Sequence, residues 1–108
     1  MKDSSSTCHA IQAASTEAQV ISIVREYFAG LSPEKAAFVP TAVLKVGMNY
    51  AQDVAQAALE IANREAHAEP NAPEAAFLRD VGIVLSTAAM RLVVLACGVE
   101  SEAEQSTS

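Results

Sequence analysis

Apolar residues recur at helical spacing in three stretches of the chain, which proline and glycine separate. The first stretch lies between Thr16 and Gly30. Its large apolar residues fall on one helical face: Val20, Ile21, Ile23, Val24, Tyr27 and Phe28. Thr16 and Gln19 have the spacing of a capping box, in which each side chain satisfies a free backbone N–H at the start of a helix. This stretch predicts a short first helix.

A long helix is expected next, after a brief connector. Ser32 and Pro33 form a helix start signal, but Pro40 limits this element to one or two turns, because proline disfavours helical geometry in the preceding residue. From Pro40 to about Ala68 the pattern predicts one long helix with a clean polar face. The segment 69–73 then contains two prolines and is the clearest turn in the chain. Because this connection is short, the helices on either side are expected to pack as an antiparallel hairpin.

The last stretch, from about Pro73 to Cys97, is expected to be a helix with two apolar stripes. The main stripe holds Phe77, Leu78, Val81, Val84, Leu85, Ala88, Leu92 and Leu95. The second stripe lies roughly opposite and holds Ile83, Met90, Val94 and Cys97. Narrow polar seams separate the two. A helix that is apolar nearly all round is buried on most sides, so both stripes need a cover.

A membrane span is the alternative explanation of this stretch, since the nineteen residues from Val81 to Val99 reach the length required. Arg91 lies near their middle and costs about 2.5–3.5 kcal/mol on the insertion scale, which offsets most of the gain from Leu, Ile and Val. Acidic residues follow the stretch, and no basic flank sets an orientation. A buried helix is therefore expected, with no membrane partner.

The second stripe predicts self-association. One chain supplies one short and one long helix to cover its last helix, whereas two chains packed through Ile83, Met90, Val94 and Cys97 would bury the second stripe of both. A twofold arrangement is the commonest oligomer geometry. The alternative is that the first helix and Phe38 cover this stripe within one chain. The expected fold class is all-α: a small helical bundle with a short N-terminal helix and a long antiparallel helical hairpin, completed by formation of a homodimer.

Composition agrees with this fold class and sets the domain limits. The 108 residues allow one domain at most, and 51% hydrophobic residues with only 5% aromatics and many alanines favour helix. Residues 1–15 are rich in Ser, Thr and Ala and are expected to be a flexible N-terminal arm. Residues 16–99 are expected to form a single helical domain, and the acidic residues 100–108 a disordered tail.

Charge and the N-terminus bear on partners and location. The net charge is −6 and the seven basic residues are scattered, so no nucleic-acid-binding patch is present in the sequence. Cys8 and Cys97 do not make a disulfide framework. The first residues lack the apolar core of a secretory signal, and a cytoplasmic location is therefore expected.

The sequence contains no catalytic or metal-binding signature. Cys8 and His9 are adjacent but lack a second ligand pair at zinc spacing. Carboxylate-bridged metal sites in helical bundles use Glu-x-x-His, whereas Glu65 and His67 are two apart. We therefore expect neither catalytic residues nor a metal or cofactor, and we interpret these acids as a solvated polar face.

Arg91 is the residue whose role is open. If it is buried it needs an acidic partner, because an unpaired buried charge is costly, and Asp53 or Glu60 of the preceding helix would serve, as would an acid from a second subunit. Alternatively, Arg91 could receive an anionic ligand in a pocket lined by Met48, Tyr50 and Met90.

The function expected from these patterns is that of a non-catalytic, small acidic helical protein, which acts by self-association and protein–protein interaction as an adaptor or regulator. The alternative is a small-molecule binding protein with an apolar pocket between the hairpin and the first helix. The candidate residues for contact with a ligand or partner are Met48, Tyr50, Asp53, Glu60 and Arg91.

Overall fold

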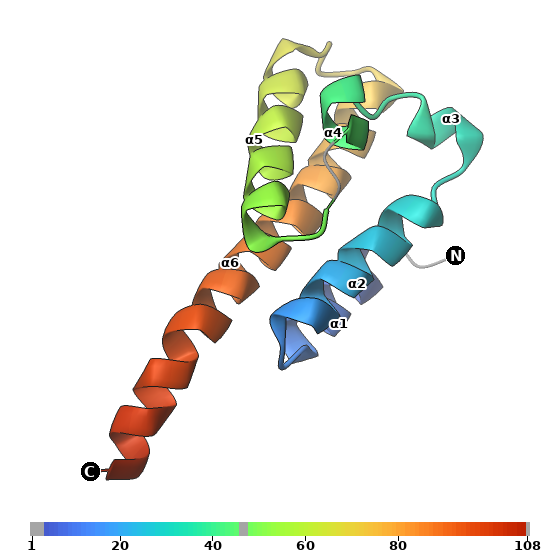
Figure 1. Cartoon of the computed structure of the whole chain (residues 1–108). Coiled ribbons are helices and arrows are strands. Elements are labelled where there is room, and N and C mark those ends of the chain that lie inside the picture. Colours follow the sequence, from blue (N-terminus) through green and yellow to red (C-terminus); the bar gives the residue numbers. More distant parts are fainter. Residues whose placement is uncertain (1–3, 46–47, 108) are drawn as a thin grey trace.

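The computed structural model describes residues 4–45 and 48–107, and the side chains of residues 4–43 and 48–97. These residues form six helices and no strand (Figure 1). The helices are α1 (Ser4–Ala13), α2 (Glu17–Ala29), α3 (Pro33–Ala36), α4 (Thr41–Lys45), α5 (Ala51–His67) and α6 (Pro73–Thr107). The all-α fold class predicted from the sequence is confirmed.

Helix α6 is the axis of the molecule. Its 35 residues, at about 1.5 Å each, match the longest dimension of the protein, 52 Å. Helix α5 packs along the first half of α6, while α1 and α2 pack against it from another side (Figure 1). The C-terminal part of α6 extends beyond the other helices (Figure 1).

The end of α6 differs from the expectation. The helix was expected to stop at Cys97 and to be followed by a disordered tail over 100–108, but it continues through Gly98 to Thr107. The composition of this segment offers a reason. Ala, Glu and Gln are among the better helix formers, and a single glycine inside a helix costs only about 1 kcal/mol relative to alanine.

The segment expected to be a flexible arm forms α1 and packs against both α6 and α2. Thr7, Ile11 and Ala14 are buried, and they follow one another at four and three residues, which places them on one side of α1. The Cys8 thiol also donates a hydrogen bond to the hydroxyl of Thr87 on α6, with 3.6 Å between Sγ and Oγ1. Mostly small side chains at helical spacing thus form a buried face, although Ile11 is the only large apolar residue among them.

Local hydrogen bonds start α2 and α3. The caps at Thr16 and Ser32 form as the sequence predicts, but the return bond of the expected capping box goes to Ser15 instead of Thr16. The backbone N–H of Gln19 donates to Oγ1 of Thr16 at 3.2 Å, and the side-chain oxygen of Gln19 accepts from the backbone N–H of Ser15 at 2.7 Å. The N–H of Lys35 donates to Oγ of Ser32 at 3.3 Å. The bonds to Thr16 and Ser32 satisfy backbone donors that the first helical turn leaves without a partner, whereas the bond from Ser15 fixes the chain just before α2.

The prediction of a single long helix over residues 40–68 is wrong in its first third. The helical conformation is interrupted between α4 and α5. Met48 lies in the left-handed region with φ 50°, where a helix cannot continue. Oδ2 of Asp53 then accepts hydrogen bonds from the backbone N–H groups of Asn49 (3.0 Å) and Tyr50 (3.2 Å), which starts α5. Asp53 is therefore a local cap for α5 rather than part of a solvated polar face.

The core lies between α6 and the helices around it. Its fully buried large side chains are Ile11, Val20, Val24, Val54, Ile61, Leu78, Val81, Val84 and Leu85. The rings of Phe38 and Phe77 meet at 5.8 Å between centroids, which fastens the segment after α3 to the start of α6.

Replacement of Asp53 tests this account of the start of α5. Asp53→Ala removes both hydrogen bonds to the backbone and is expected to lower the free energy of unfolding by about 1 kcal/mol. Urea unfolding followed by circular dichroism measures the change. Gln56→Ala, an exposed site in the next turn of α5, is the matched control and should change stability little. Equal stability of the two variants would contradict the capping role.

Candidate functional site

Helix α6 buries one face and exposes the other, as its two stripes predict. Seven of the eight residues in the main stripe are buried: Phe77, Leu78, Val81, Val84, Leu85, Ala88 and Leu92. Leu95 is half-buried and packs against the edge of the core. These residues contact the other helices of the same chain, so the main stripe is the part of α6 that the single chain covers.

The opposite side of α6, here called the outer face, consists of Ile83, Met90, Val93, Val94 and Cys97. The exposed fractions of its four large residues are 50% for Ile83, 70% for Met90, 61% for Val93 and 51% for Val94. Cys97 is exposed and is not in a disulfide. Within the described chain, neither α1, α2, α5 nor Phe38 covers this face, so the alternative of an intramolecular cover is wrong. Val93 was not among the residues predicted for this face, although its position three residues after Met90 places it there.

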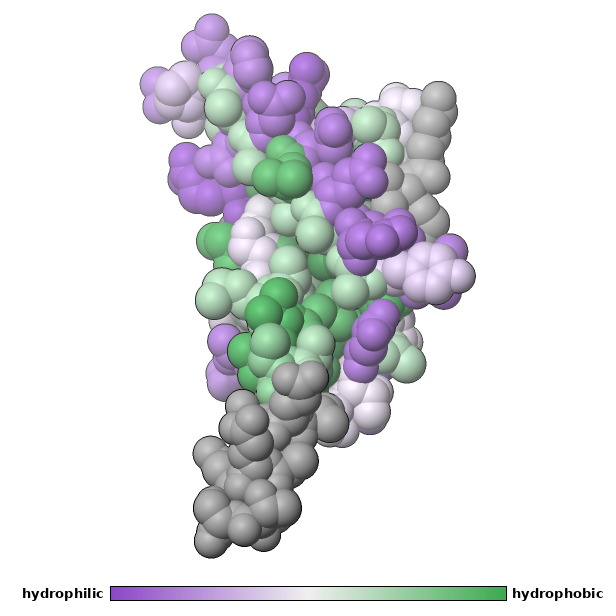
Figure 2. Space-filling model, turned by 60° about the vertical axis from the view of Figure 1, so that its left-hand side comes forward, coloured by the Kyte–Doolittle hydropathy of each residue, from purple (hydrophilic) through white to green (hydrophobic). Residues whose placement is uncertain are grey.

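A shallow groove follows the outer face where α5 and α6 meet, and it is here called the α5–α6 groove. It has a volume of about 370 Å³ and is lined by Ala58, Ala62, Glu65, Arg79, Gly82, Ile83, Ser86, Thr87 and Met90. Figure 2 shows apolar surface gathered on this side of the molecule, with polar side chains around its upper part. The two helices lie close together at Gly82, where an added Cβ would make an ordinary van der Waals contact with α5, 3.7 Å from Cγ2 of Ile61.

Two ion pairs border the α5–α6 groove where α5 ends and α6 begins. Nε of Arg64 donates to Oε1 of Glu74 at 3.1 Å, and Nε of Arg79 lies 3.8 Å from Oε2 of Glu65. Both arginine side chains are more than half exposed, so each pair contributes little to stability. They place charge at the start of the outer face.

By length and composition alone, α6 also fits a membrane environment. The residues Pro73–Cys97 are long and apolar enough to cross a membrane, a property that the core helix of a soluble protein can share.

Arg91 binds a backbone carbonyl instead of the acids that the sequence suggested. Its Nε and Nη2 both donate to the carbonyl oxygen of Ala14, at 3.0 Å and 2.8 Å. Ala14 directly follows α1, where carbonyl groups have no partner within the helix. The expected pairing with Asp53 or Glu60 is therefore wrong. The segment that includes α1 was not expected to be folded, and the carbonyl at its end is the group that Arg91 binds.

The other predicted contact residues do not form one site. Met48 is buried, Tyr50 is 63% exposed, and Asp53 is engaged by the backbone at the start of α5. Glu60 lies about two turns further along α5 and is half-buried. Arg91 is held at the end of α1, so the structure does not bring the five residues around a common ligand.

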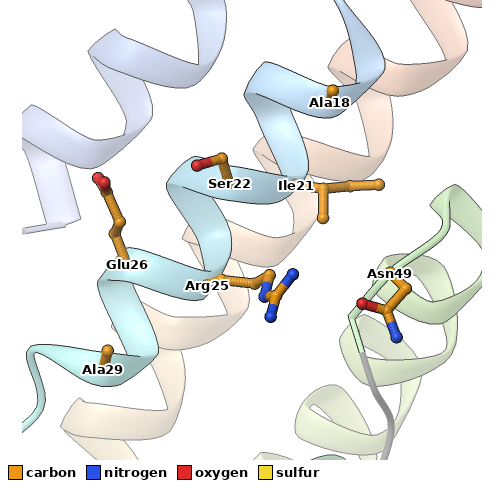
Figure 3. A pocket seen from close by; sticks show the side chains of 7 residues that line it. All are labelled: Ala18, Ile21, Ser22, Arg25, Glu26, Ala29 and Asn49. Atoms are coloured by element: carbon orange, nitrogen blue, oxygen red, sulfur yellow. The ribbon is translucent and has the colours of Figure 1, made fainter.

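A hollow between α2 and the segment before α5 is the nearest match to the expected pocket. It has a volume of about 530 Å³ and is lined by Ala18, Ile21, Ser22, Arg25, Glu26, Ala29 and Asn49. In Figure 3 the side chains of Arg25 and Asn49 extend toward each other across it. The lining is thus polar as well as apolar, in contrast to the apolar pocket that the sequence suggested.

Tyr27 is a buried titratable group on α2. Burial raises the pKa of Tyr27 to about 12, and the nearby charges of Asp80 and Cys8 add to the effect. Its ring packs edge-on against Phe28, with 5.7 Å between centroids. Tyr27 is therefore part of the contact between α2 and its neighbours. Across the described residues, no three His, Cys, Asp or Glu side chains gather where they could hold a metal ion.

Comparison of the chain with protein-family models, with curated proteins and with solved structures gave no match. The candidate site is accordingly defined by its own residues: the outer face of α6 and the adjoining α5–α6 groove.

Arg91→Met tests the contact between α6 and α1. This change keeps the apolar stem but removes both donors to the Ala14 carbonyl, so we expect a loss of about 1–3 kcal/mol in unfolding free energy and faster amide exchange over residues 4–13. Hydrogen exchange followed by mass spectrometry measures the local effect. Lys35→Met, at an exposed site on α3, is the control. Unchanged exchange in α1 would show that the contact is not needed to hold it.

The stability of the protein should fall as the pH rises from about 10 to about 12. The unfolded chain ionises the Tyr27 phenol near its ordinary pKa of 10, whereas the folded chain does so near 12, so the contribution is complete below pH 10 and is lost above it. The loss is at most about 2–3 kcal/mol at 1.36 kcal/mol for each pKa unit. Urea unfolding at pH 9 and pH 11.5, compared between wild type and Tyr27→Phe, isolates this contribution. An identical pH dependence in both proteins would refute it.

Proposed function

We propose that this protein is a non-catalytic helical module that self-associates and acts through protein–protein contact. The observation that supports this most directly is the outer face of α6, where four large apolar side chains are each at least half exposed on one helix. Contiguous apolar patches are uncommon on soluble monomers and mark interaction surfaces when they occur. Contact between two such faces would remove this apolar surface from water.

The proposed interface consists of Ile83, Met90, Val94 and Cys97, with Val93 added from the structure. These residues share one side of α6, so a twofold axis through this side brings the same patch of two copies together. The resulting assembly is a homodimer in which each chain completes the bundle of the other. This supports a role as an adaptor or regulator, whose other partners contact surfaces outside the interface.

The proposal includes a cytoplasmic location, and it assigns no role to nucleic acid. The net charge of −6 opposes binding to a polyanion. The exposed face of α6 is proposed to meet protein rather than lipid, since Arg91 lies in the middle of the apolar stretch and no basic residue follows it in the sequence.

A small-molecule binding role is the second candidate, supported by the hollow between α2 and the segment before α5. Its volume of about 530 Å³ lies in the range of ligand sites, and Arg25 with Asn49 could orient an anionic group. The hollow is lined mostly by exposed side chains, so it ranks below self-association. Ligand binding there would raise the melting temperature of a monomeric protein.

The decisive test of self-association is the mass in solution across a concentration series, by sedimentation or light scattering. Wild type should be a dimer, whereas Ile83→Glu and Val94→Glu should be helical monomers. Each change places two charges in the apolar interface of a dimer and removes two apolar contacts, so we expect the dissociation constant to rise roughly a hundredfold or more.

Leu59→Glu is the matched control for these variants. Leu59 is 72% exposed on α5 and does not line the α5–α6 groove, so its replacement should leave the dimer intact. A wild-type protein that stays monomeric at all concentrations would sink the proposal. Unchanged dimer mass in both α6 variants would move the interface elsewhere.

A further inference from the structure

The geometry points to the arrangement of the proposed dimer, and this inference rests on the proposed self-association. We infer that the outer faces of two α6 helices pack antiparallel, with Met90 of each copy near the twofold axis. In this arrangement Val94 and Cys97 of one chain lie over the α5–α6 groove of the other. The occupant of the groove is therefore a second copy of this chain, through the part of α6 that follows Met90.

The spacing of residues on the outer face is that of a helix-pairing seam. Ile83, Met90 and Cys97 follow one another at intervals of seven residues, and Ser86 and Val93 lie three residues after the first two. This alternation of three and four is the pattern by which two helices keep the same side toward each other over several turns. All five of these residues are exposed in the single chain, so the seam is free to meet a partner.

Helix α6 is longer than each of the helices that pack against it. Leu92 is the last buried residue described in this helix, and Leu95 is only half-buried, yet the helix continues to Thr107. The C-terminal part of α6 extends past the other helices, so none of the other described helices lies along it (Figure 1). In an antiparallel pair, the part that extends from one copy lies along the helical bundle of the other copy, and the reverse is also true.

The α5–α6 groove has the shape that such an arrangement needs. Its lining includes the small residues Ala58, Ala62, Gly82 and Ser86, which let another helix approach closely. With Met90 opposite Met90, Ile83 of one chain lies level with Cys97 of the other, and Ser86 lies level with Val94. The apolar residues after Met90 thus come to lie over the small residues before it.

Charge decides between the two possible directions. Arg79 begins the outer face, where it is more than half exposed and forms a long ion pair with Glu65 at 3.8 Å. Residues 98–107 hold Glu100, Glu102 and Glu104 in the sequence and no basic residue. A parallel pair would bring Arg79 beside its own copy and the two acidic ends together. An antiparallel pair with the axis at Met90 brings Arg79 level with position 101 of the other chain, between two glutamates, and also sets the helix dipoles in opposite directions.

Disulfide trapping tests the direction of packing. In a Cys8→Ala background, Ile83→Cys should give a covalent dimer on mild oxidation, with peptides joined between positions 83 and 97, because these positions face each other in the antiparallel pair. The same background without the second change, which retains only Cys97, should give little covalent dimer. Leu59→Cys is the control for random collision and should cross-link no faster than Cys97 alone.

The outcomes separate this inference from the proposed function. Rapid joining of Cys97 to Cys97, with 83 joined to 83, would overturn the antiparallel arrangement and favour a parallel one, and so would a dimer of normal mass that forms neither link. A monomeric mass would overturn self-association itself. If that monomer co-sediments with phosphatidylcholine vesicles, the occupant of the outer face is a lipid surface.

A second measurement uses charge alone and does not depend on cysteine chemistry. Arg79→Gln removes the attraction to the acidic end of the other chain, so the dimer dissociation constant should rise about two- to fivefold at low salt, as expected for exposed ion pairs. In a parallel pair the same change would relieve repulsion and lower the constant. A lower or unchanged value would therefore contradict the antiparallel arrangement.

Discussion

The rest of this fold depends on α6, which carries apolar side chains on two opposite faces and buries one of them against the other helices. Its main stripe is buried against α5 on one side and against α1 and α2 on another. Three shorter helices cover this stripe, and the small residues Ala58, Ala62 and Gly82 lie where α5 and α6 meet. They do not reach around to the outer face, and this shortfall is what makes the outer face the candidate interaction surface.

The contact of Arg91 with α1 shows how a charged residue is accommodated in such a helix. Arg91 meets the free carbonyl of Ala14 with two donors, so its charge faces the negative end of α1 rather than an acidic side chain. The same contact orders the N-terminal segment, together with the buried Thr7 and Ile11. The polar residues Thr87 and Arg91, which lie between the two faces of α6, therefore hold α1 in place. The outer face is not used in this contact.

Much of the candidate site could be predicted from periodicity, because a straight helix places residues on its faces by their number alone. Ile83, Met90 and Val94 were assigned in this way to a stripe opposite the core, and they are exposed. The groove beside them could not be predicted, since it depends on how closely α5 approaches α6. Ala58 and Ala62 gave no chemical signal of their own, and the position of Gly82 opposite Ile61 of α5 follows only from the packing of the two helices.

The sequence by itself determined the helical class of the chain, the capping of α2 and α3, and the division of α6 into two faces, because each of these follows from local spacing. Only the tertiary structure decided the fate of residues 4–13, the break at Met48 and the partner of Arg91. These features depend on contacts between residues far apart in the chain. A segment of small residues such as Ser4–Ala13 becomes ordered when another helix supplies the surface on which it packs, and no pattern within the segment specifies that surface.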